Sequence, residues 1–271
     1  MYWRDVWRFI NSNEYEFKYP GKYGAKGEKR AKRKKATPEQ VRKQNQANRE
    51  KKIRRLIKKN FRPNDLWCTL KYPEGARPSL EQVKKDLKNF LERMRKKRKK
   101  RNVIFKFIYR IDIGEYGGVH IHVLLNRSNK KPDTDIEVQE EWKAGRVNYE
   151  SIYELGGYKK LADYITQEPS EEEYEQLSLF PKEEQKKFKS YSTSRNLIRP
   201  EPERSEYRRR TVRKLIEEGP KPTPGYYIDK NSIVSGVNRY TGMSYLHYTE
   251  VRIKEIRSGL PLEREEEWNT E

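Results

Sequence analysis

Cysteine, histidine and apolar residues are all scarce in this chain of 271 residues. Cys68 is the only cysteine, so no disulfide can form within the chain, and a reducing, intracellular compartment is expected. Only 33% of the residues are apolar, and no apolar run approaches the roughly 20 residues that span a bilayer. The first residues also lack the basic start and apolar block of a secretory signal. We therefore expect a cytoplasmic protein without a membrane segment.

Charged residues are abundant instead, and the basic ones are unevenly distributed. Charged residues make up 38% of the chain, and the net formal charge is +21. Residues 26–59 hold 16 Lys or Arg against three Glu, and residues 93–101 hold eight Lys or Arg and no acid. Basic side chains that neutralise phosphates release counterions, so this segregation predicts a polyanionic partner. A solvated charged helix, or a tail that only aids solubility, is the alternative interpretation.

The distribution of apolar residues predicts three parts. Residues 1–60 are expected to form an aromatic and basic N-terminal extension, with a strand at 15–19 and a mostly polar helix at 38–59. Residues 61–202 carry the periodic apolar segments of a main domain. Residues 203–271 are expected to hold a helix, a β-hairpin and an acidic tail, with His247 in a structural role.

The main domain begins with alternating and helical patterns. The segment DLWCTLKY, residues 65–72, alternates as a strand does. Ser79 has the spacing of a helix cap, and the apolar stripe after it predicts a helix that packs on a sheet and ends in the basic run 93–101. A second strand is expected at 103–113, and an exposed acidic insertion at 168–187. The combination predicts an α+β fold with a central antiparallel sheet and helices packed on one face.

Two of the three histidines, His120 and His122, lie two residues apart in an alternating segment. Residues two apart in a strand point to the same face, so both imidazoles are expected to project together. Gly117-Gly118 is typical of a two-residue hairpin turn, which would place Glu115 opposite His120. Two imidazoles and one carboxylate are a donor set for a divalent metal. A polar sheet face is the alternative, and a register slip of one residue would remove Glu115.

The ordered motifs of the main domain resemble those of the HUH endonucleases. DLWCTLKY, IGEYGGVHIHVLLN, LADYITQEP and YSTSRNLIRP carry the resemblance over roughly residues 61–202, and the replication-associated proteins of small single-stranded DNA phages and related bacterial elements are the most similar. The resemblance implies a ferredoxin-like core. It also implies a metal-dependent endonuclease that nicks and joins single-stranded DNA through a 5′-phosphotyrosine and so initiates rolling-circle replication. Mg2+ or Mn2+ is the implied cofactor.

The resemblance also implies which tyrosine is the nucleophile. Tyr164 matches by position, on a helix predicted over residues 157–168, and Tyr158 is the reserve candidate. A packing role is the alternative for any one of the 19 tyrosines. Gln167 stands where family members often carry a lysine, and it can only form hydrogen bonds, so Lys159 or Lys160 is the candidate substitute for that cation. The side chains expected to contact DNA are Lys96, Lys97, Arg98, Lys159, Lys160, Arg195 and Asn196.

The expected partners follow from the same resemblance. They are a single-stranded DNA origin, which can be a hairpin, together with a helicase and a DNA polymerase of a bacterial host. No Gly-x-x-x-x-Gly-Lys phosphate-binding loop is present, so strand separation is assigned to the host helicase. Two other functions stay open. One is an HUH transposase or plasmid relaxase with the same chemistry, and the other is a basic nucleic-acid-binding protein without catalysis.

Overall fold

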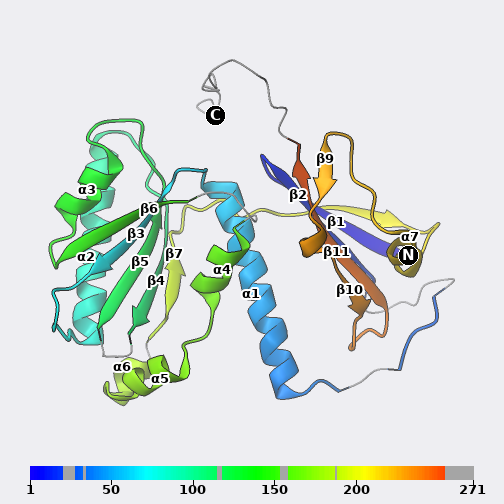
Figure 1. Ribbon diagram of the computed structural model, residues 1–271, viewed down its shortest axis with the longest axis horizontal. Helices are drawn as coiled ribbons and strands as arrows, with labels where there is room; N and C mark the ends of the chain where they lie inside the picture. The colour runs from blue at the N-terminus through cyan, green and yellow to red at the C-terminus, as the bar shows by residue number, and fades with distance from the viewer. Residues whose placement is uncertain (21–27, 33–34, 115–117, 153–157, 187, 254–271) are drawn as a thin grey trace. The chain divides into compact units, whose positions relative to one another are not determined.

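The structure is a computed structural model, and Figure 1 shows its course. It describes residues 1–20, 28–32, 35–114, 118–152, 158–186 and 188–253. The fold is α+β, as the sequence predicts, but it contains two antiparallel sheets where the sequence predicts one central sheet. The chain divides into two compact units, one of residues 35–201 and the other of residues 1–34 together with 202–271.

The unit of residues 35–201 is built on a five-stranded sheet with the order β6-β3-β5-β4-β7. Each neighbouring pair in this order is antiparallel. The strands are β3 (Leu66–Lys71), β4 (Phe107–Ile113), β5 (Val119–Leu125), β6 (Arg146–Ser151) and β7 (Tyr191–Thr193). The alternation that predicts the first strand at residues 65–72 is visible in its burial, because Leu66, Cys68 and Leu70 are fully buried and the residues between them are not.

Helices cover both faces of this sheet, which corrects the prediction of helices on one face. One face packs against α2 (Leu80–Lys100) and α3 (Thr134–Glu141). The other packs against α1 (Pro38–Asn60) and α4 (Lys159–Thr166). The sequence of α1 is mostly polar, but its apolar cluster is wholly used, since Ile53, Leu56 and Ile57 are buried against that second face. A short apolar cluster is enough to dock a helix when the rest of the helix stays in solvent.

The N-terminal half of α2 forms as its sequence predicts. The Ser79 side chain accepts a hydrogen bond from the Gln82 backbone N–H at 3.1 Å and so caps the helix. Val83, Leu87, Phe90 and other members of the apolar stripe enter the core cluster on that face of the sheet. The stripe therefore fixes which side of α2 faces the sheet.

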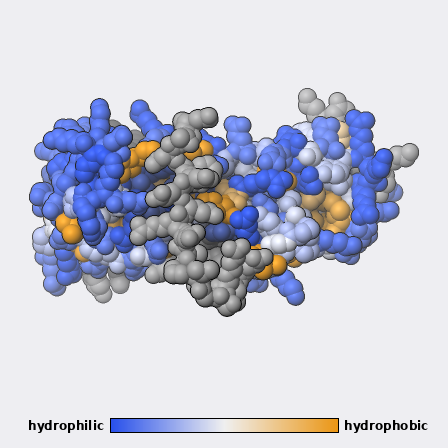
Figure 2. Space-filling view, turned by 90° about the horizontal axis from the view of Figure 1, so that it is seen from above, coloured by the Kyte–Doolittle hydropathy of each residue, from blue (hydrophilic) through white to orange (hydrophobic). Residues whose placement is uncertain are grey.

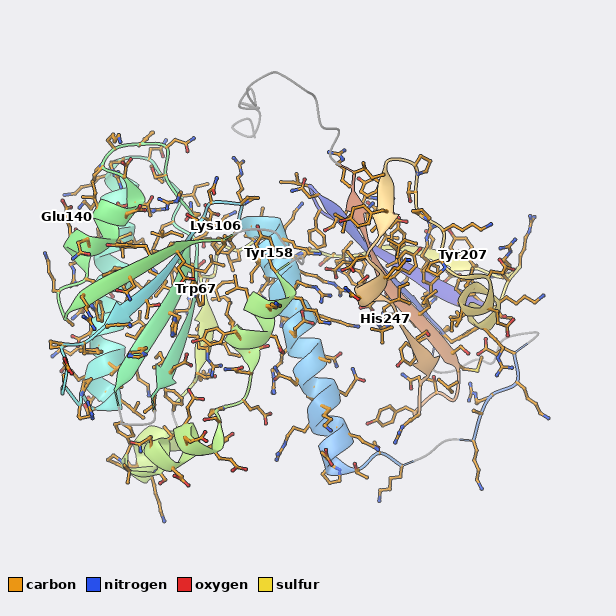
Figure 3. All side chains as sticks on the ribbon, in the orientation of Figure 1. Trp67, Lys106, Glu140, Tyr158, Tyr207 and His247 are labelled. Carbon is orange, nitrogen blue, oxygen red and sulfur yellow. The ribbon has the colours of Figure 1, made fainter. Side chains whose placement is uncertain are left out.

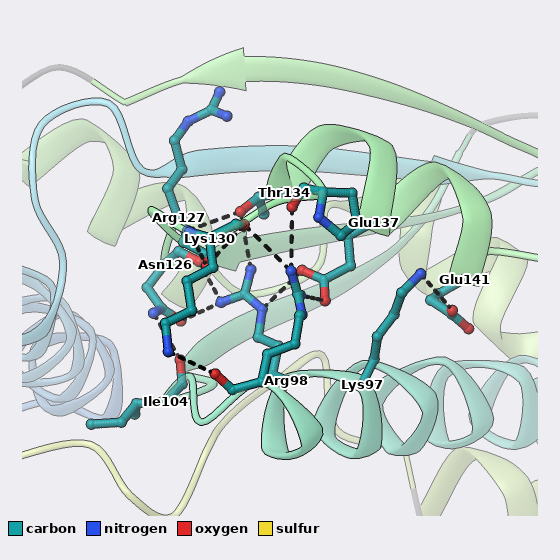
Figure 4. A network of polar contacts seen from close by, with 12 residues as sticks. Lys97, Arg98, Ile104, Asn126, Arg127, Lys130, Thr134, Glu137 and Glu141 are labelled. Atoms are coloured by element: carbon teal, nitrogen blue, oxygen red, sulfur yellow. Dashed lines mark hydrogen bonds and ion pairs between the residues drawn. The ribbon is translucent and has the colours of Figure 1, made fainter.

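Only part of the basic C-terminal half of α2 is exposed, because acidic residues of α3 hold the rest of it (Figure 4). Arg98 is fully buried, and its Nε donates to Glu137 Oε2 at 3.1 Å. Its other nitrogens donate to the Asn126 carbonyl at 2.7 Å and to the Thr134 hydroxyl at 3.2 Å. Lys97 forms ion pairs with Glu140 and Glu141. The predicted role of Arg98 in binding DNA is therefore wrong, since its guanidinium serves the fold.

The acidic stretch after α4 forms two short helices, α5 (Glu171–Ser178) and α6 (Lys182–Lys186). Ser170 caps α5 by accepting a hydrogen bond from the Glu173 backbone N–H, and the Glu173 carboxylate accepts one from the Ser170 backbone N–H. None of the α5 residues is buried, which agrees with the expected exposed insertion.

The second unit joins the two ends of the chain in one six-stranded sheet with the order β10-β11-β2-β1-β8, where β9 also pairs with β11. Its strands are β1 (Tyr2–Arg8), β2 (Ser12–Lys18), β8 (Glu203–Tyr207), β9 (Tyr226–Ile228), β10 (Val234–Val237) and β11 (Ser244–Arg252), with α7 (Val212–Glu218) and a 3-10 turn, η1 (Lys230–Ser232). The sequence-based division separates residues 1–60 from 203–271, whereas β2 pairs with β11 and β1 with β8.

Aromatic packing accounts for this union of the chain ends. The rings of Tyr15 and Tyr248 are stacked with centroids 4.9 Å apart, and Tyr2 and Tyr207 are stacked at 5.4 Å. The helix predicted to begin near residue 203 begins at Val212, because residues 203–207 form the edge strand β8. The alternation of residues within one β-strand does not reveal which distant segment that strand pairs with.

The outer surface is mostly hydrophilic, with small apolar areas, as Figure 2 shows for one face. Within the described ranges, none of the helices combines the length and the apolar composition that a bilayer crossing requires.

Candidate active site

The two histidines of β5 lie on the sheet face that α1 and α4 cover. Val119, Ile121 and Val123 point into the cluster beneath α2, so His120 and His122 project to the opposite face. Both imidazoles are partly buried. The predicted common orientation of the two histidines is thus present.

The register of the β4–β5 hairpin differs from the predicted one. Asp112 pairs with His120, and the strands end at Ile113 and resume at Val119. The Gly114 N–H donates to the Gly118 carbonyl at 2.8 Å across this connection. A two-residue turn at Gly117-Gly118 is therefore wrong, and the carboxylate paired with His120 is that of Asp112. Glu115, the predicted third ligand, lies outside the described residues.

Asp112 stands at the centre of the site. Its Oδ2 lies 3.4 Å from His122 Nε2 and accepts a hydrogen bond from the Tyr164 hydroxyl. Its Oδ1 accepts a hydrogen bond from Arg110 Nε. One carboxylate therefore joins an imidazole, a phenol and a guanidinium, and it comes from a residue that the sequence analysis did not single out.

A signal for Asp112 was present in the sequence. The strand predicted over 103–113 places its odd-numbered residues on one face, which leaves Arg110 and Asp112 on the other face, next to the hairpin. Two neighbouring charged residues on that face at the histidine end of the strand, beyond Ile108, indicate a polar site. Only the hairpin register could identify which carboxylate meets His120.

Tyr164 lies beside the histidines, as the predicted site requires. It projects from α4, and its ring centroid is 5.3 Å from that of His122, with the two planes perpendicular. Trp67 of β3, labelled in Figure 3, is stacked on His122 at 5.6 Å and meets the Tyr164 ring edge-on at 6.1 Å. Burial, together with Asp112, raises the pKa of the Tyr164 hydroxyl, so the phenol is protonated at neutral pH.

The two imidazoles are in the protonation state that metal ligation needs. Burial lowers the pKa of His122, and burial together with Lys71 lowers that of His120, so both rings are neutral at pH 7. His122 Nδ1 also lies 3.1 Å from the Thr69 hydroxyl. Two neutral imidazoles and a carboxylate are suitable donors for a divalent cation.

The present arrangement of these donors is not that of a closed metal centre. The His120 and His122 rings are 6.4 Å apart and perpendicular, and Asp112 is engaged by Arg110 and Tyr164. Among the described residues, no group of three or more His, Cys, Asp or Glu side chains is arranged to hold a metal ion. The donor types themselves, two imidazoles and a carboxylate, fit a divalent cation.

Arg110 connects the strand of Asp112 to the helix of Tyr164. Its side chain is only 1% exposed, and Nη1 donates to the carbonyls of Ile165 at 3.2 Å and Gln167 at 2.8 Å. The guanidinium carbon lies 5.5 Å from the centroid of the Tyr164 ring. This places a permanent positive charge beside the phenol. Gln167 contributes only its backbone carbonyl, which accepts a hydrogen bond from Arg110.

The other predicted site residues are spread over the unit of residues 35–201. Tyr158 is buried in the cluster that α1 and α4 form, at the position before α4 begins (Figure 3). Asn196 donates to the Phe105 carbonyl at 3.0 Å, which gives it a structural contact. The remaining exposed candidates are Lys96, Lys159, Lys160 and Arg195.

The third histidine belongs to the second unit. His247 lies in β11, where it pairs with Val234 and Glu16, and its ring is 5.3 Å from that of Tyr245. It is therefore in a different unit from His120 and His122 (Figure 3).

Comparison with protein families matches residues 65–169 to a family of replication-associated proteins, described as Replication-associated protein ORF2. The matched segment is less than half of the chain, runs from β3 to just beyond α4, and includes Asp112, His120, His122 and Tyr164. The resemblance to replication-associated proteins is thus confirmed for these residues. No curated protein and no solved structure matches the chain.

Proposed function

With the match of residues 65–169 to the replication-associated protein family as the premise, we propose that the protein nicks and rejoins single-stranded DNA to initiate rolling-circle replication. One observation carries the proposal: the Tyr164 hydroxyl is hydrogen-bonded to Asp112, beside His122 and on the same sheet face as His120. A nucleophile, an acceptor for its proton and two neutral imidazoles thus lie together.

The proposed reaction is a transesterification at a DNA phosphate. The Tyr164 oxygen attacks phosphorus, its proton passes to the Asp112 carboxylate, and the bond from phosphorus to the 3′ oxygen breaks. The departing 3′ oxygen takes this proton from Asp112, which restores the carboxylate, and the 5′ phosphate stays on the tyrosine. Because the raised pKa keeps Tyr164 protonated, an adjacent proton acceptor is needed for attack at neutral pH. Reversal of the same steps rejoins the strand, and the free 3′ end is available to a host polymerase.

We propose His120, His122 and one oxygen of Asp112 as the ligands of a divalent cation, Mg2+ or Mn2+, while the other oxygen of Asp112 accepts the proton of Tyr164. Such an ion, when bound, would polarise a non-bridging phosphate oxygen and neutralise charge on the phosphate. Asp112 replaces Glu115 in this proposal because it pairs directly with His120 and contacts His122. Its hydrogen bond also tethers Tyr164 to the same carboxylate, which keeps the nucleophile beside the ion site.

Arg110 is proposed as the cation that Gln167 does not supply. A guanidinium 5.5 Å from the phenol ring favours negative charge developing on the tyrosine and the phosphate. Its bonds to the carbonyls at the end of α4 also hold the helix that carries Tyr164. Lys71 of β3, which pairs with both His120 and Arg146, provides further positive charge on this face for the DNA backbone.

The chain order supports a ferredoxin-like core for the proposed enzyme. Strand β3, helix α2, strands β4 and β5, helix α3 and strand β6 follow one another as β-α-β-β-α-β. Both crossover helices pack on one face of the sheet. The proposed chemistry takes place on the other face, where α4 brings Tyr164 over the strands.

A covalent adduct assay tests the nucleophile. The full chain is incubated with a labelled single-stranded oligonucleotide carrying the origin sequence, with and without Mn2+, and a shifted band is sought on a denaturing gel. We expect an adduct that depends on metal, is lost in Tyr164→Phe and persists in Tyr158→Phe, since Tyr158 is buried away from the surface. The opposite pattern would move the nucleophile to Tyr158. If the wild-type protein binds the oligonucleotide but forms no adduct, the alternative function of a nucleic-acid-binding protein without catalysis is favoured.

A calorimetric comparison of two carboxylate variants tests the third ligand. We expect Asp112→Asn to weaken Mn2+ binding by at least about tenfold, as loss of groups supporting a metal site does. Glu115→Gln, which removes the same charge three residues away, is expected to bind Mn2+ within about threefold of wild type. If Glu115→Gln instead abolishes binding while Asp112→Asn binds normally, the ligand role returns to Glu115.

A further inference from the structure

A groove of about 1030 Å³ runs between α2 and the β4–β7 edge of the sheet. Phe107, Tyr109 and Ile111 of β4 line it, and this side of β4 belongs to the core cluster beneath α2. His120 and His122 project from the opposite side of the sheet. The groove is therefore separate from the candidate active site and lies on the other face.

Basic side chains line both walls of this groove. Those of α2 are spaced four, seven and four residues apart, so they lie along one side of the helix over about 22 Å at 1.5 Å per residue. The only acidic residue among the lining side chains is Glu92. The basic residues are Lys84, Lys88, Arg95 and Lys99 on α2, and Lys189 and Arg195 on the opposite wall.

Two sets of cations on α2 and its C-cap residue have different surroundings. One set faces α3 and is ion-paired with its carboxylates; it consists of Arg93, Lys97, Arg98 and Arg101. The other set lines the groove. Within the described ranges, no carboxylate forms an ion pair with Lys88, Arg95, Lys99, Lys189 or Arg195. Of the α2 cations outside the set that faces α3, Lys84, Lys88, Arg95 and Lys99 line the groove, and Lys85, Lys96 and Lys100 do not.

Aromatic rings lie next to one another along the floor. The ring centroids of Phe105 and Phe107 are 5.3 Å apart, and Phe107 and Tyr109 are stacked at 6.3 Å. Phe105 and Phe107 are buried beneath the floor, whereas Tyr109 is partly exposed and Ile104 at the rim is 66% exposed, so these last two side chains present the apolar surface to a ligand. Aromatic surfaces between rows of cations are the means by which proteins hold unpaired bases and their phosphates.

We propose that this groove binds a single-stranded stretch of the same DNA whose scissile phosphate lies at Asp112 and Tyr164. The proposal rests on the proposed function and gives the substrate a second contact surface. β7 is the last strand of the sheet order, so DNA passes from one face to the other around a single strand. Arg195 and Ser192 of this edge line the groove, and Tyr191 of the same strand packs on the face that α4 covers.

The chemistry of the groove favours single-stranded DNA over other polyanions. Duplex DNA keeps its bases paired and stacked, so they would not meet the aromatic floor. An acidic peptide would satisfy the cations but carries no regular series of planar groups. A single strand offers both, a phosphate for each nucleotide and a flat base that can stack.

Two double variants that remove the same charge from α2 provide the test. Arg95→Gln with Lys99→Gln removes two cations of the groove, whereas Lys85→Gln with Lys100→Gln removes two exposed cations of the same helix that do not line it. Binding of fluorescein-labelled oligodeoxythymidine of about 20 nucleotides to the full chain is measured by anisotropy at several salt concentrations. Each single-strand phosphate contact contributes about 0.7 to the salt slope, or about fivefold in affinity at 0.1 M salt.

The groove variant should therefore lose about 1.4 from the slope and about 25-fold in affinity, and the matched variant should stay within about threefold of wild type. Equal losses in the two variants would overturn the proposal. So would tighter wild-type binding of oligouridine, of a duplex or of polyglutamate. If the groove variant melts earlier than wild type, Lys88→Gln with Arg195→Gln replaces it, with the same expected losses.

Adduct formation separates this proposal from the proposed function. At saturating origin oligonucleotide, the groove variant should form the Tyr164 adduct to the wild-type extent, because its active site is intact. A wild-type chain that binds oligodeoxythymidine through the groove but forms no adduct would contradict the nicking function and leave the groove as a DNA-binding surface. Loss of the adduct in a groove variant that is folded and saturated would contradict the separation of the two sites.

Discussion

Replacing Glu137 with Gln tests whether the basic end of α2 serves the fold. The Glu137 side chain is fully buried and accepts hydrogen bonds from Arg98 and Arg101. Arg98 is equally buried, so the substitution keeps the shape of the side chain but leaves a buried guanidinium without its counterion. Removing one partner of a buried ion pair costs about 3–5 kcal/mol. Because Arg98 keeps its contacts with Asn126 and Thr134, we take the lower end, about 3 kcal/mol.

Thermal melting of the full chain, followed by circular dichroism at pH 7, measures this loss. A domain of 150–250 residues loses roughly 2–4 °C of melting midpoint per kcal/mol, so the unit of residues 35–201 should melt roughly 6–12 °C earlier. Glu140→Gln is the matched control on the same helix. Its partner is Lys97 and its side chain is 52% exposed, so its loss should be below about 1 kcal/mol.

Two results would contradict a structural role for the Arg98–Glu137 pair. A Glu137→Gln protein that melts within about 2 °C of wild type would mean that the buried pair contributes little. An Arg98→Gln protein that folds normally but binds oligodeoxythymidine as weakly as the groove variant would return Arg98 to the DNA interface. Neither Glu137→Gln nor Glu140→Gln should weaken DNA binding, since each removes negative charge.

Two further predictions concern the candidate active site. Arg110→Lys keeps a positive charge near Tyr164 but not the bonds to Ile165 and Gln167, so adduct formation should slow by about tenfold, and Arg110→Gln by about a hundredfold. Equal rates for the two variants, measured at saturating DNA, would contradict the electrostatic role. The second prediction follows from the lowered pKa values of His120 and His122. Because of them, both rings stay neutral at a lower pH than an ordinary imidazole does. Two imidazoles at an ordinary pKa of about 6.5 would lose roughly tenfold or more in metal affinity between pH 7.5 and pH 6.0. Calorimetry with Mn2+ should give a smaller loss, and a loss of that full size would show that the pKa values are not lowered.

Local sequence signals were sufficient for most elements of the unit of residues 35–201. The alternation at residues 65–72, the Ser79 cap with its apolar stripe, and the alternation around His120 and His122 each depend on neighbours in the chain. Such patterns report which side of an element is buried. They therefore predicted β3, α2 and the common face of the two histidines correctly.

The hairpin register could not be obtained in this way. Gly117-Gly118 fits a two-residue turn, but the connection between β4 and β5 runs from Gly114 to Gly118, and this changes the carboxylate that meets His120. A shift of three residues also exchanges the two faces of the strand, because the side-chain period is two. Turn composition alone does not determine how long a connection is.

Contacts between residues far apart in the sequence also could not be predicted. The acidic partners of Arg98 and Arg101 lie on α3, some 36–39 residues along the chain, so a charge count over 93–101 overstates the charge available to DNA. The strands at the two chain ends pair with each other for the same kind of reason, since β2 and β11 are far apart in sequence. Neither the ion pairs between α2 and α3 nor the pairing of β2 with β11 can be recognised from a short stretch of sequence.

The most direct measurement of the central claim is the mass of the peptide that carries the nucleotide. After reaction with an origin oligonucleotide and Mn2+, the protein is digested with nuclease and protease, and the modified peptide is sequenced by tandem mass spectrometry. The nucleotide should be on Tyr164, and Asp112→Asn should reduce its amount strongly. A nucleotide found on any other residue, or an unmodified Tyr164 in a chain that cleaves the DNA, would contradict the proposed active site.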